Sequence, residues 1–271
     1  MAVNRTESIS GEGGHDKMAK DSGDGLPPGV ETAWGLRERP GKGPRPGLSV
    51  SRIVGAAIEL AAAEGIAAVS MARVAAALGV STMSLYRYVT SKEELLVLME
   101  DTASGPPPQG PVPEEEGWRA ALAHWARSHR EVLHRNLWML RIPVSSPPVT
   151  PNSVAWMERG LACLRGTGLD EGEKVQVILL VSGFVRNEAT LAADIEAAAR
   201  ASGRSTAETM ASYTRLLGRL TDPERFPAVT ALLASGVMEQ PEEPDDDFAF
   251  GLERLLDGVE VLVRARNAPG R

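Results

Sequence analysis

The stretch from Val74 to Leu95, "VAAALGVSTMSLYRYVTSKEEL", constrains the fold more than any other part of the chain. Apolar residues recur at helical spacing on both sides of Gly79, and glycine is favoured where a helix ends in a left-handed turn. Ser70 and Ser81 stand where side-chain N-caps are expected. We therefore predict two short helices joined by a tight turn, which is a helix-turn-helix motif.

A helix is predicted on each side of this motif. Apolar residues at helical spacing run from Ile53 to Ala61, after an N-cap at Ser49 or Ser51, and end at Gly65. The sequence "SKEE" resembles a capping box and opens a helix that should run to about residue 102. These elements predict a first domain over residues 47–102.

The remainder of the chain is also helical in pattern. Five prolines in "SGPPPQGPVPEEEG" predict a linker over residues 103–117. Beyond it we expect helices near 118–135, 152–167, 171–200, 205–219 and 247–266. No alternating strand pattern competes with them, so the fold class is all-α, with a second helical domain over residues 118–266.

Residues 82–88 carry side chains suited to reading DNA. At about 100° per residue, four of them share an arc of about 140°, and Leu85 lies on the opposite side. Arginine can bond guanine N7 and O6, and threonine or methionine can pack on a thymine methyl group. The candidates for base contacts are Thr82, Met83 and Arg87, and those for phosphate contacts are Ser84, Tyr86, Tyr88, Lys92 and Arg73.

Some of these residues have a second interpretation. Tyr86 and Tyr88 could pack between helices, and Arg73 could cover its own apolar neighbours. The overall charge of −7 does not exclude DNA, because charge acts locally. From Arg37 to Lys92 there are eight Lys or Arg and three Asp or Glu, a balance of +5.

Residues 1–46 are rich in glycine, serine, proline and charge, and we expect a largely disordered tail. Its last part and the residue that follows, "WGLRERPGKGPRPG", contain four basic residues, among them Arg45, and one acid. This segment is either a solvated linker or an arm that contacts DNA next to the first helix.

The sequence gives no sign of an enzyme. It contains no G-x-S-x-G motif, P-loop or dinucleotide fingerprint. The single cysteine, Cys163, excludes an intramolecular disulfide and is expected to be a buried small apolar residue. His124, His129 and His134 are five residues apart, a spacing that does not place them on one helix face, so no metal site and no cofactor are predicted.

A membrane span is not expected either. The most apolar run, "VQVILLVSGFV", is short and is flanked by Lys174 and Arg186. The first residues lack the apolar segment of a secretory signal, so we expect a cytoplasmic protein without a membrane partner.

With these residues assembled, the segment "IVGAAIELAAAEGIAAVSMARVAAALGVSTMSLYRYVTSKEELL" resembles the DNA-binding domain of the TetR family of bacterial transcriptional regulators. The segments "GLACLRGTGLDEGEKVQVILLVSGFV" and "FGLERLLDGVEVL" are similar to the C-terminal domain type of the tetracycline repressor. The resemblance implies a homodimeric repressor on a palindromic double-stranded operator, released by a small molecule. An activator, or a DNA-binding protein without an effector, is the alternative. Ala72 stands where the tetracycline repressor has a guanine-reading arginine, so its operator specificity does not transfer.

The resemblance also implies a dimer interface formed by the helices near 171–200 and 247–266. These two helices carry more apolar surface than one helix face of a monomer needs, although the apolar faces of both helices could instead pack within one subunit. The apolar residues are Val177, Leu180, Val181, Phe184, Phe250, Leu252, Leu255, Leu256, Val259 and Leu262.

Large rings in the second domain suggest where an effector would bind, because they offer area and stacking to an apolar ligand. The expected effector is bulky and largely apolar, and tetracycline itself is not expected. The predicted pocket residues, each of which could instead pack in the core, are Trp125, His129, Trp138, Trp156, Phe184 and Asn187.

Overall fold

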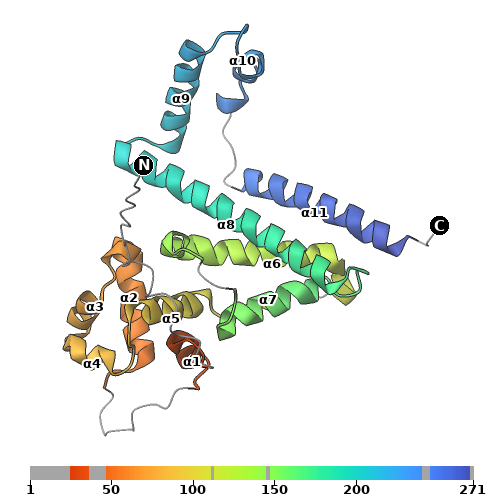
Figure 1. Cartoon of the computed structure of the whole chain (residues 1–271). Helices are drawn as coiled ribbons and strands as arrows, with labels where there is room; N and C mark the ends of the chain where they lie inside the picture. Colours follow the sequence, from red (N-terminus) through yellow and green to blue (C-terminus); the bar gives the residue numbers. More distant parts are fainter. Residues whose placement is uncertain (1–24, 37–46, 111–112, 145–146, 240–244, 269–271) are drawn as a thin grey trace, which may run out of the picture.

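The computed structural model describes residues 25–36, 47–110, 113–144, 147–239 and 245–268. Every regular element in these ranges is a helix, and together they give the expected all-α fold (Figure 1). Arg45 and the rest of the predicted basic arm between residues 37 and 46 lie outside the described ranges.

The N-terminal domain forms around the predicted helix-turn-helix. Its helices are α2 (Val50–Glu64), α3 (Met71–Leu78), α4 (Thr82–Tyr86) and α5 (Lys92–Ser104), with a 3₁₀ turn η1 (Ile66–Ala68) after α2. Ser49, Ser70, Ser81 and Ser91 each cap the following helix by accepting a backbone N–H, which satisfies donors that the first turn leaves open. Gly79 ends α3 with φ 67°, in the left-handed region that glycine adopts without strain.

One apolar core holds these helices together. It contains Ile53 from α2, Val74 from α3 and Leu85 from α4, all completely buried. Val89, before α5, and Leu95, on α5, belong to the same core and are also completely buried. The two short helices of the motif are therefore fixed by burial of one side chain face each, and their other faces remain available.

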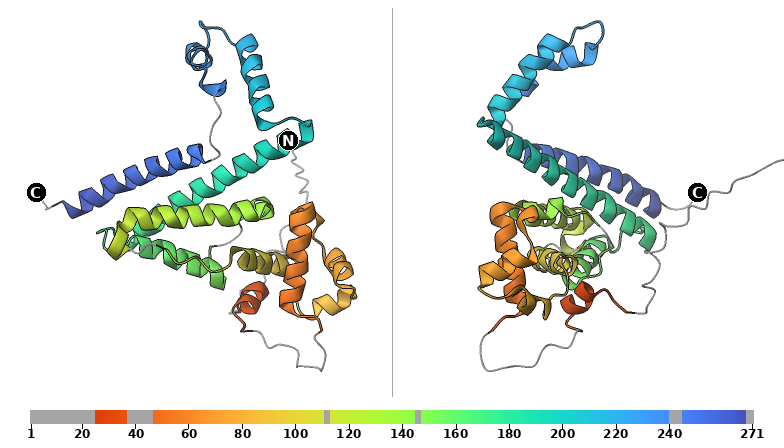
Figure 2. Two further views of the ribbon diagram at one scale, coloured as in Figure 1. Left: turned by 180° about the vertical axis from the view of Figure 1, so that it is seen from behind. Right: turned by 60° about the vertical axis from the view of Figure 1, so that its left-hand side comes forward.

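The C-terminal domain is a layered helical bundle. Its elements are α6 (Pro113–Arg135), η2 (Leu137–Arg141), α7 (Pro151–Cys163), α8 (Glu171–Ser202), α9 (Thr206–Leu220), α10 (Pro227–Ala234), η3 (Val237–Glu239) and α11 (Asp246–Asn267). In Figures 1 and 2, α8 and α11 run side by side over α6 and α7. Buried residues of α6, α7, α8 and α11, among them Leu122, Cys163, Val181 and Leu252, form a second core.

Helices α9 and α10 project from this bundle as an arm (Figures 1 and 2). The arm leaves the C-terminal end of α8 and returns to the start of α11. It exposes large apolar side chains in this single chain, including Tyr213, Leu216 and Leu220. Such a surface is unusual for a monomer and indicates contact with another molecule.

Two helices begin where the sequence predicted a tail or a linker, and one short helix was not predicted. Within the tail predicted to be disordered, residues Pro28–Ala33 form the short helix α1, and within the predicted linker α6 already begins at Pro113. Proline is favoured in the first helical turn, and the helix that begins there is interrupted at Gly117 (φ 83°). Helix α10 was missed because its eight residues, "PAVTALLA", are apolar on nearly all sides and have no period.

Candidate DNA-binding surface and effector site

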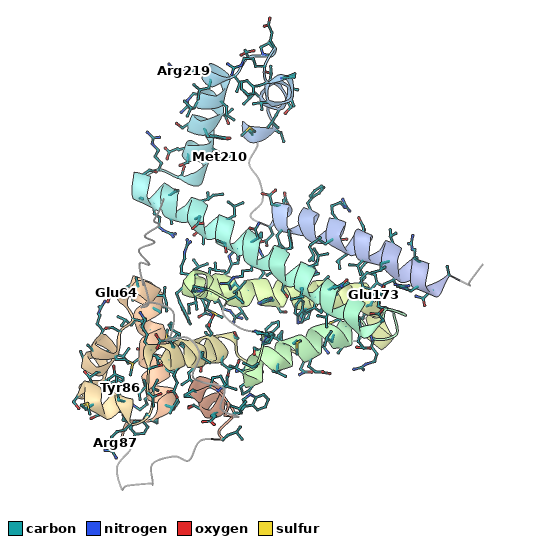
Figure 3. The ribbon with its side chains drawn as sticks, in the orientation of Figure 1. Glu64, Tyr86, Arg87, Glu173, Met210 and Arg219 are labelled. Atoms are coloured by element: carbon teal, nitrogen blue, oxygen red, sulfur yellow. The ribbon has the colours of Figure 1, made fainter. Side chains whose placement is uncertain are left out.

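Helix α4 presents an exposed face away from the rest of the molecule. Ser81 accepts the N–H of Ser84, and Leu85 anchors the helix to the core. On the outer face Met83 is 75% exposed, and Tyr86 and Arg87 are also exposed. Figure 3 places Tyr86 and Arg87 at the end of the molecule opposite the α9 arm. This arrangement lets α4 enter a groove of DNA without a change in the fold.

The other DNA-contact candidates differ in accessibility. Thr82, Ser84 and Tyr88 are half-buried, and Tyr88 also packs against the N-terminal core. Lys92 is exposed in the first turn of α5, beside α4. A phosphate contact there would use both the lysine ammonium group and the free N–H groups of the helix start.

Arg73 has a partner within the chain. Its Nη2 lies 2.6 Å from Glu64 Oε1 at the end of α2, and both side chains are about half exposed. The salt bridge lowers the pKa of Glu64 through the hydrogen bond with Arg73. Arg73 therefore joins α2 to α3, and a contact with phosphate would have to compete with this carboxylate.

Three of the predicted pocket residues meet in the second domain. The ring centroids of Trp125 and His129 are 5.7 Å apart, those of His129 and Trp156 5.5 Å, and those of Trp125 and Trp156 6.3 Å. Trp125 Nε1 donates to the carbonyl oxygen of Trp156 at 3.0 Å. Gly160 allows Trp125 to lie close to α7, since a Cβ at this position would be 3.1 Å from its ring. We call Trp125, His129 and Trp156 the aromatic cluster.

His129 is neutral within this cluster. Burial lowers the pKa of its imidazole to about 4, and the nearby charge of Arg186 acts in the same direction. Its Nδ1 is buried and has no hydrogen-bond partner within the described chain. A buried polar atom without a partner is costly, so this nitrogen is available to a ligand that reaches the cluster.

The other three predicted pocket residues lie elsewhere. Trp138, on η2, is buried with Met139 and Ile142 in the N-terminal core, and its Nε1 has no partner within the described chain. Phe184 stacks on Phe248 of α11, with centroids 5.5 Å apart. Asn187 is exposed on α8. The six predicted pocket residues therefore lie in four places, because sequence spacing does not show which face of a helix meets which neighbour.

The two domains meet at η2 and at α5. Although η2 follows α6 in the chain, its side chains pack in the N-terminal core, so its contacts with α8 join the two domains. On the α8 side, Arg186 Nη2 donates to the carbonyl oxygens of Met139 (3.2 Å) and Ile142 (2.9 Å), and Arg141 pairs with Asp194. On α5, Asp101 accepts three hydrogen bonds from Asn152 at the start of α7, two at its carboxylate (2.9 and 3.2 Å) and one at its carbonyl oxygen (2.9 Å). The N-terminal domain, which carries the candidate recognition helix α4, is thereby connected to the bundle by specific polar contacts as well as by the chain.

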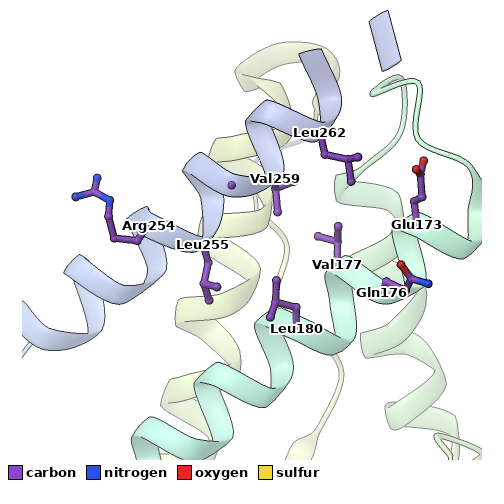
Figure 4. Close-up of a pocket in the computed structure, with 9 residues that line it drawn as sticks. Glu173, Gln176, Val177, Leu180, Arg254, Leu255, Val259 and Leu262 are labelled. Atoms are coloured by element: carbon purple, nitrogen blue, oxygen red, sulfur yellow. The ribbon is translucent and has the colours of Figure 1, made fainter. Parts of the chain in front are cut away.

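A groove between α8 and α11 was not anticipated from the sequence (Figure 4). It has a volume of about 300 Å³, and its lining residues are Glu173, Gln176, Val177, Leu180, Arg254, Leu255, Gly258, Val259 and Leu262. Leu180 is 51% exposed and Phe250 66% exposed, whereas Val181 and Leu256 are completely buried. The apolar residues of α8 and α11 therefore serve two faces, one inside the subunit and one outside it.

Three further features bear on redox chemistry, metal binding and membrane insertion. Cys163 is buried, as expected, and donates to the carbonyl oxygen of Arg159 at 3.2 Å, and burial raises its pKa. Among the described residues, no three His, Cys, Asp or Glu side chains lie close enough to hold a metal ion. Helix α8 is long and apolar enough by composition to cross a membrane, and 28% of its most apolar window is buried inside the molecule.

Comparison with known proteins agrees with this organisation. Residues 53–99 match the family "Bacterial regulatory proteins, tetR family", and residues 110–263 match "Tetracyclin repressor-like, C-terminal domain". The repressor DrrR1 of Streptomyces coeruleorubidus is 36% identical over 265 residues, which are 97% of this chain and 96% of that protein. The repressor Rv1353c of Mycobacterium tuberculosis is 29% identical over 86% of this chain and 87% of its own length.

Solved structures show the same fold. The crystal structure of the Streptomyces coelicolor TetR family protein ActR in complex with actinorhodin has a TM-score of 0.68 and 28% identity, and the match covers 79% of this chain and 96% of that one. Apo ActR has a TM-score of 0.63 and 29% identity over 81% of this chain and 98% of its own. The chain therefore belongs to the TetR family of bacterial transcriptional regulators, which bind DNA and are not enzymes.

Proposed function

We propose that this chain is a cytoplasmic homodimeric repressor that binds a palindromic operator and leaves it when a bulky aromatic molecule binds the C-terminal domain. The observation that carries the proposal is the exposed face of α4, which offers Met83, Tyr86 and Arg87 to a groove and contains no acidic residue. The second domain adds an aromatic cluster that a DNA-binding module alone would not need.

The proposed contacts divide into two kinds. Arg87, Thr82 and Met83 read base edges in the major groove, with Arg87 bonding guanine. Ser84, Tyr86, Tyr88 and Lys92 bind phosphates and fix the orientation of α4. Ala72 is exposed and short, so the first turn of α3 leaves the operator positions near it unread.

The proposed dimer forms through the outer faces of α8 and α11. Both helices expose apolar side chains: Leu180 of α8 lines the groove between them, and Phe250 of α11 is exposed near the start of its helix. Two such pairs packed together would form a four-helix bundle with a continuous apolar seam. A dimer interface also accounts for the apolar composition of α8, so no membrane span is needed. The apolar surface continues from α8 onto α11, and the charged residues Glu173 and Arg254 border it.

The proposed effector site is the aromatic cluster. ActR is similar in fold and has been solved with actinorhodin, which supports a bulky ring system as the ligand class. A ligand between Trp125 and Trp156 would gain stacking area. An oxygen on its ring could pair with Nδ1 of the neutral His129.

Selection of bound DNA from a random pool tests the proposal. The full-length chain should enrich an inverted repeat, and Arg87→Ala should lose preference at one base pair in each half. Ala76→Ser, at an exposed position of α3, serves as the control. Actinorhodin then serves as the first probe for release. Enrichment of no sequence, or of a single site without a repeat, would contradict the proposed operator.

A further inference from the structure

Helix α1 lies at the junction of the two domains and contacts both of them. It precedes the segment that matches the family, which begins at residue 53. In Figure 1 it lies beside α5, close to the start of α7. Six residues cannot form a stable helix alone, so α1 exists because of what it packs against.

One side of α1 is fixed to α5. A Cβ at Gly29 would be 3.1 Å from Val97 Cβ, so the two helices approach closely, and Val30 is buried beside them. Thr32 Oγ1 donates to Glu94 Oε1 at 2.8 Å. Glu94 is itself buried and accepts the Thr90 N–H at 2.6 Å. A hydrogen bond to a buried carboxylate is stronger than one between neutral groups, so this attachment is firm.

The other end of α1 is attached to the effector domain. Trp34 Nε1 donates to the carbonyl oxygen of Val149 at 2.7 Å. Val149 directly precedes Thr150, the N-cap of α7, the helix that carries Trp156 of the aromatic cluster. Only one residue separates Thr32 from Trp34, so little slack remains between the two attachments.

We propose that α1 is a strap through which Thr32 and Trp34 fix the angle between α5 and α7. The direct polar contacts between α5 and α7 lie at the C-terminal end of α5, where Asp101 binds Asn152 and the carbonyl oxygen of Gly105 accepts from Trp156 Nε1 at 3.0 Å. The strap adds an attachment from the N-terminal end of α5, through Thr32 and Trp34, to Val149. Movement of α7 around a bound ligand is then passed to α5 and the recognition helix. This inference rests on the proposed function at one point: in a dimer bound to a palindrome, the two recognition helices must keep a fixed separation.

Cutting the strap at either end gives a distinctive result. Trp34→Phe removes the indole donor and releases the strap from Val149. Thr32→Val removes the hydroxyl donor to Glu94 and loosens the strap at α5, where the packing of Gly29 and Val30 remains. Trp34→Phe should weaken binding to the palindromic operator by about tenfold and Thr32→Val by less, and the double variant should be no weaker than Trp34→Phe alone. Binding to a half-site should not change, because one recognition helix suffices there. Thr32→Ser should restore wild-type affinity, and Leu36→Ala, at an exposed position, should have no effect.

Hydrogen exchange tests the strap without DNA. The Asn152 N–H donates to Asp101 Oδ1 at 2.9 Å, and it should exchange faster in both single variants than in the wild type. Unchanged exchange, additive losses on the palindrome, or an equal loss on the half-site would overturn the strap. If the wild-type chain bound palindrome and half-site equally, the dimeric function would fail, and the exchange rates would still decide the role of α1.

Discussion

His129 should give the protein a pH-dependent stability that His129→Phe removes. Burial lowers the pKa of His129 from 6.5 to about 4. Between these values the unfolded chain binds the proton and the folded protein does not, so the free energy of unfolding falls as the pH falls. A difference of about 2.5 pKa units corresponds to roughly 3 kcal/mol between pH 7 and pH 4.

Glu100 acts in the opposite direction. Burial raises the pKa of its carboxyl group from 4.5 to about 7, although the charge of Arg186 opposes this. The folded protein therefore binds the proton more tightly, and this contribution is present at low pH and is lost as the pH rises from 4.5 to 7. The two slopes partly cancel in the wild type, and Glu100→Gln should uncover the slope of His129.

Urea unfolding from pH 4 to pH 8 measures both effects. The free energy of unfolding of the wild type, taken relative to that of His129→Phe, should fall from pH 7 towards pH 4, because only the wild type contains an imidazole that binds a proton more tightly when the chain unfolds. In the double variant with Glu100→Gln, neither group remains, so these two positions should add no pH dependence to the free energy of unfolding. A difference between wild type and His129→Phe that stays constant over the whole range would refute the buried, neutral state of His129.

Three further substitutions test other parts of the account. Arg87→Ala should weaken the operator complex by roughly 1–3 kcal/mol and random DNA far less, as measured by fluorescence anisotropy; an equal loss on both would restrict Arg87 to phosphate. Lys92→Ala should lower affinity for all sequences and reduce the slope of log K against log salt by about one; an unchanged slope would remove it from the phosphate contacts. Leu180→Asp should shift sedimentation from dimer to monomer while the helical circular dichroism remains, and a persistent dimer would place the interface elsewhere.

The helix-turn-helix was predictable in detail because its information is local. Ser49, Ser70, Ser81 and Ser91 specify the helix starts and Gly79 the turn, and each acts within four residues of its own position. The exposed face of α4 followed from the burial of one residue, Leu85. This part of the site therefore needed no knowledge of tertiary contacts.

The effector domain was predictable only in outline, because its arrangement depends on contacts far apart in the sequence. Trp138 joined the N-terminal core, since η2 follows α6 directly and turns towards α2. Phe184 stacks on Phe248, which lies 64 residues later in the chain. Helix α1 is a further case, because its six residues pack on α5 and are followed by Trp34, which binds Val149, 115 residues away in the sequence.

The central claim is that two chains read one palindrome through paired recognition helices. Sedimentation velocity of the full-length chain with the selected operator, at a salt concentration that suppresses non-specific binding, tests it directly. We expect a complex of two chains per palindrome, and a half-site of the same length should bind much more weakly. A single chain bound per palindrome, with the same affinity for the half-site, would contradict the account.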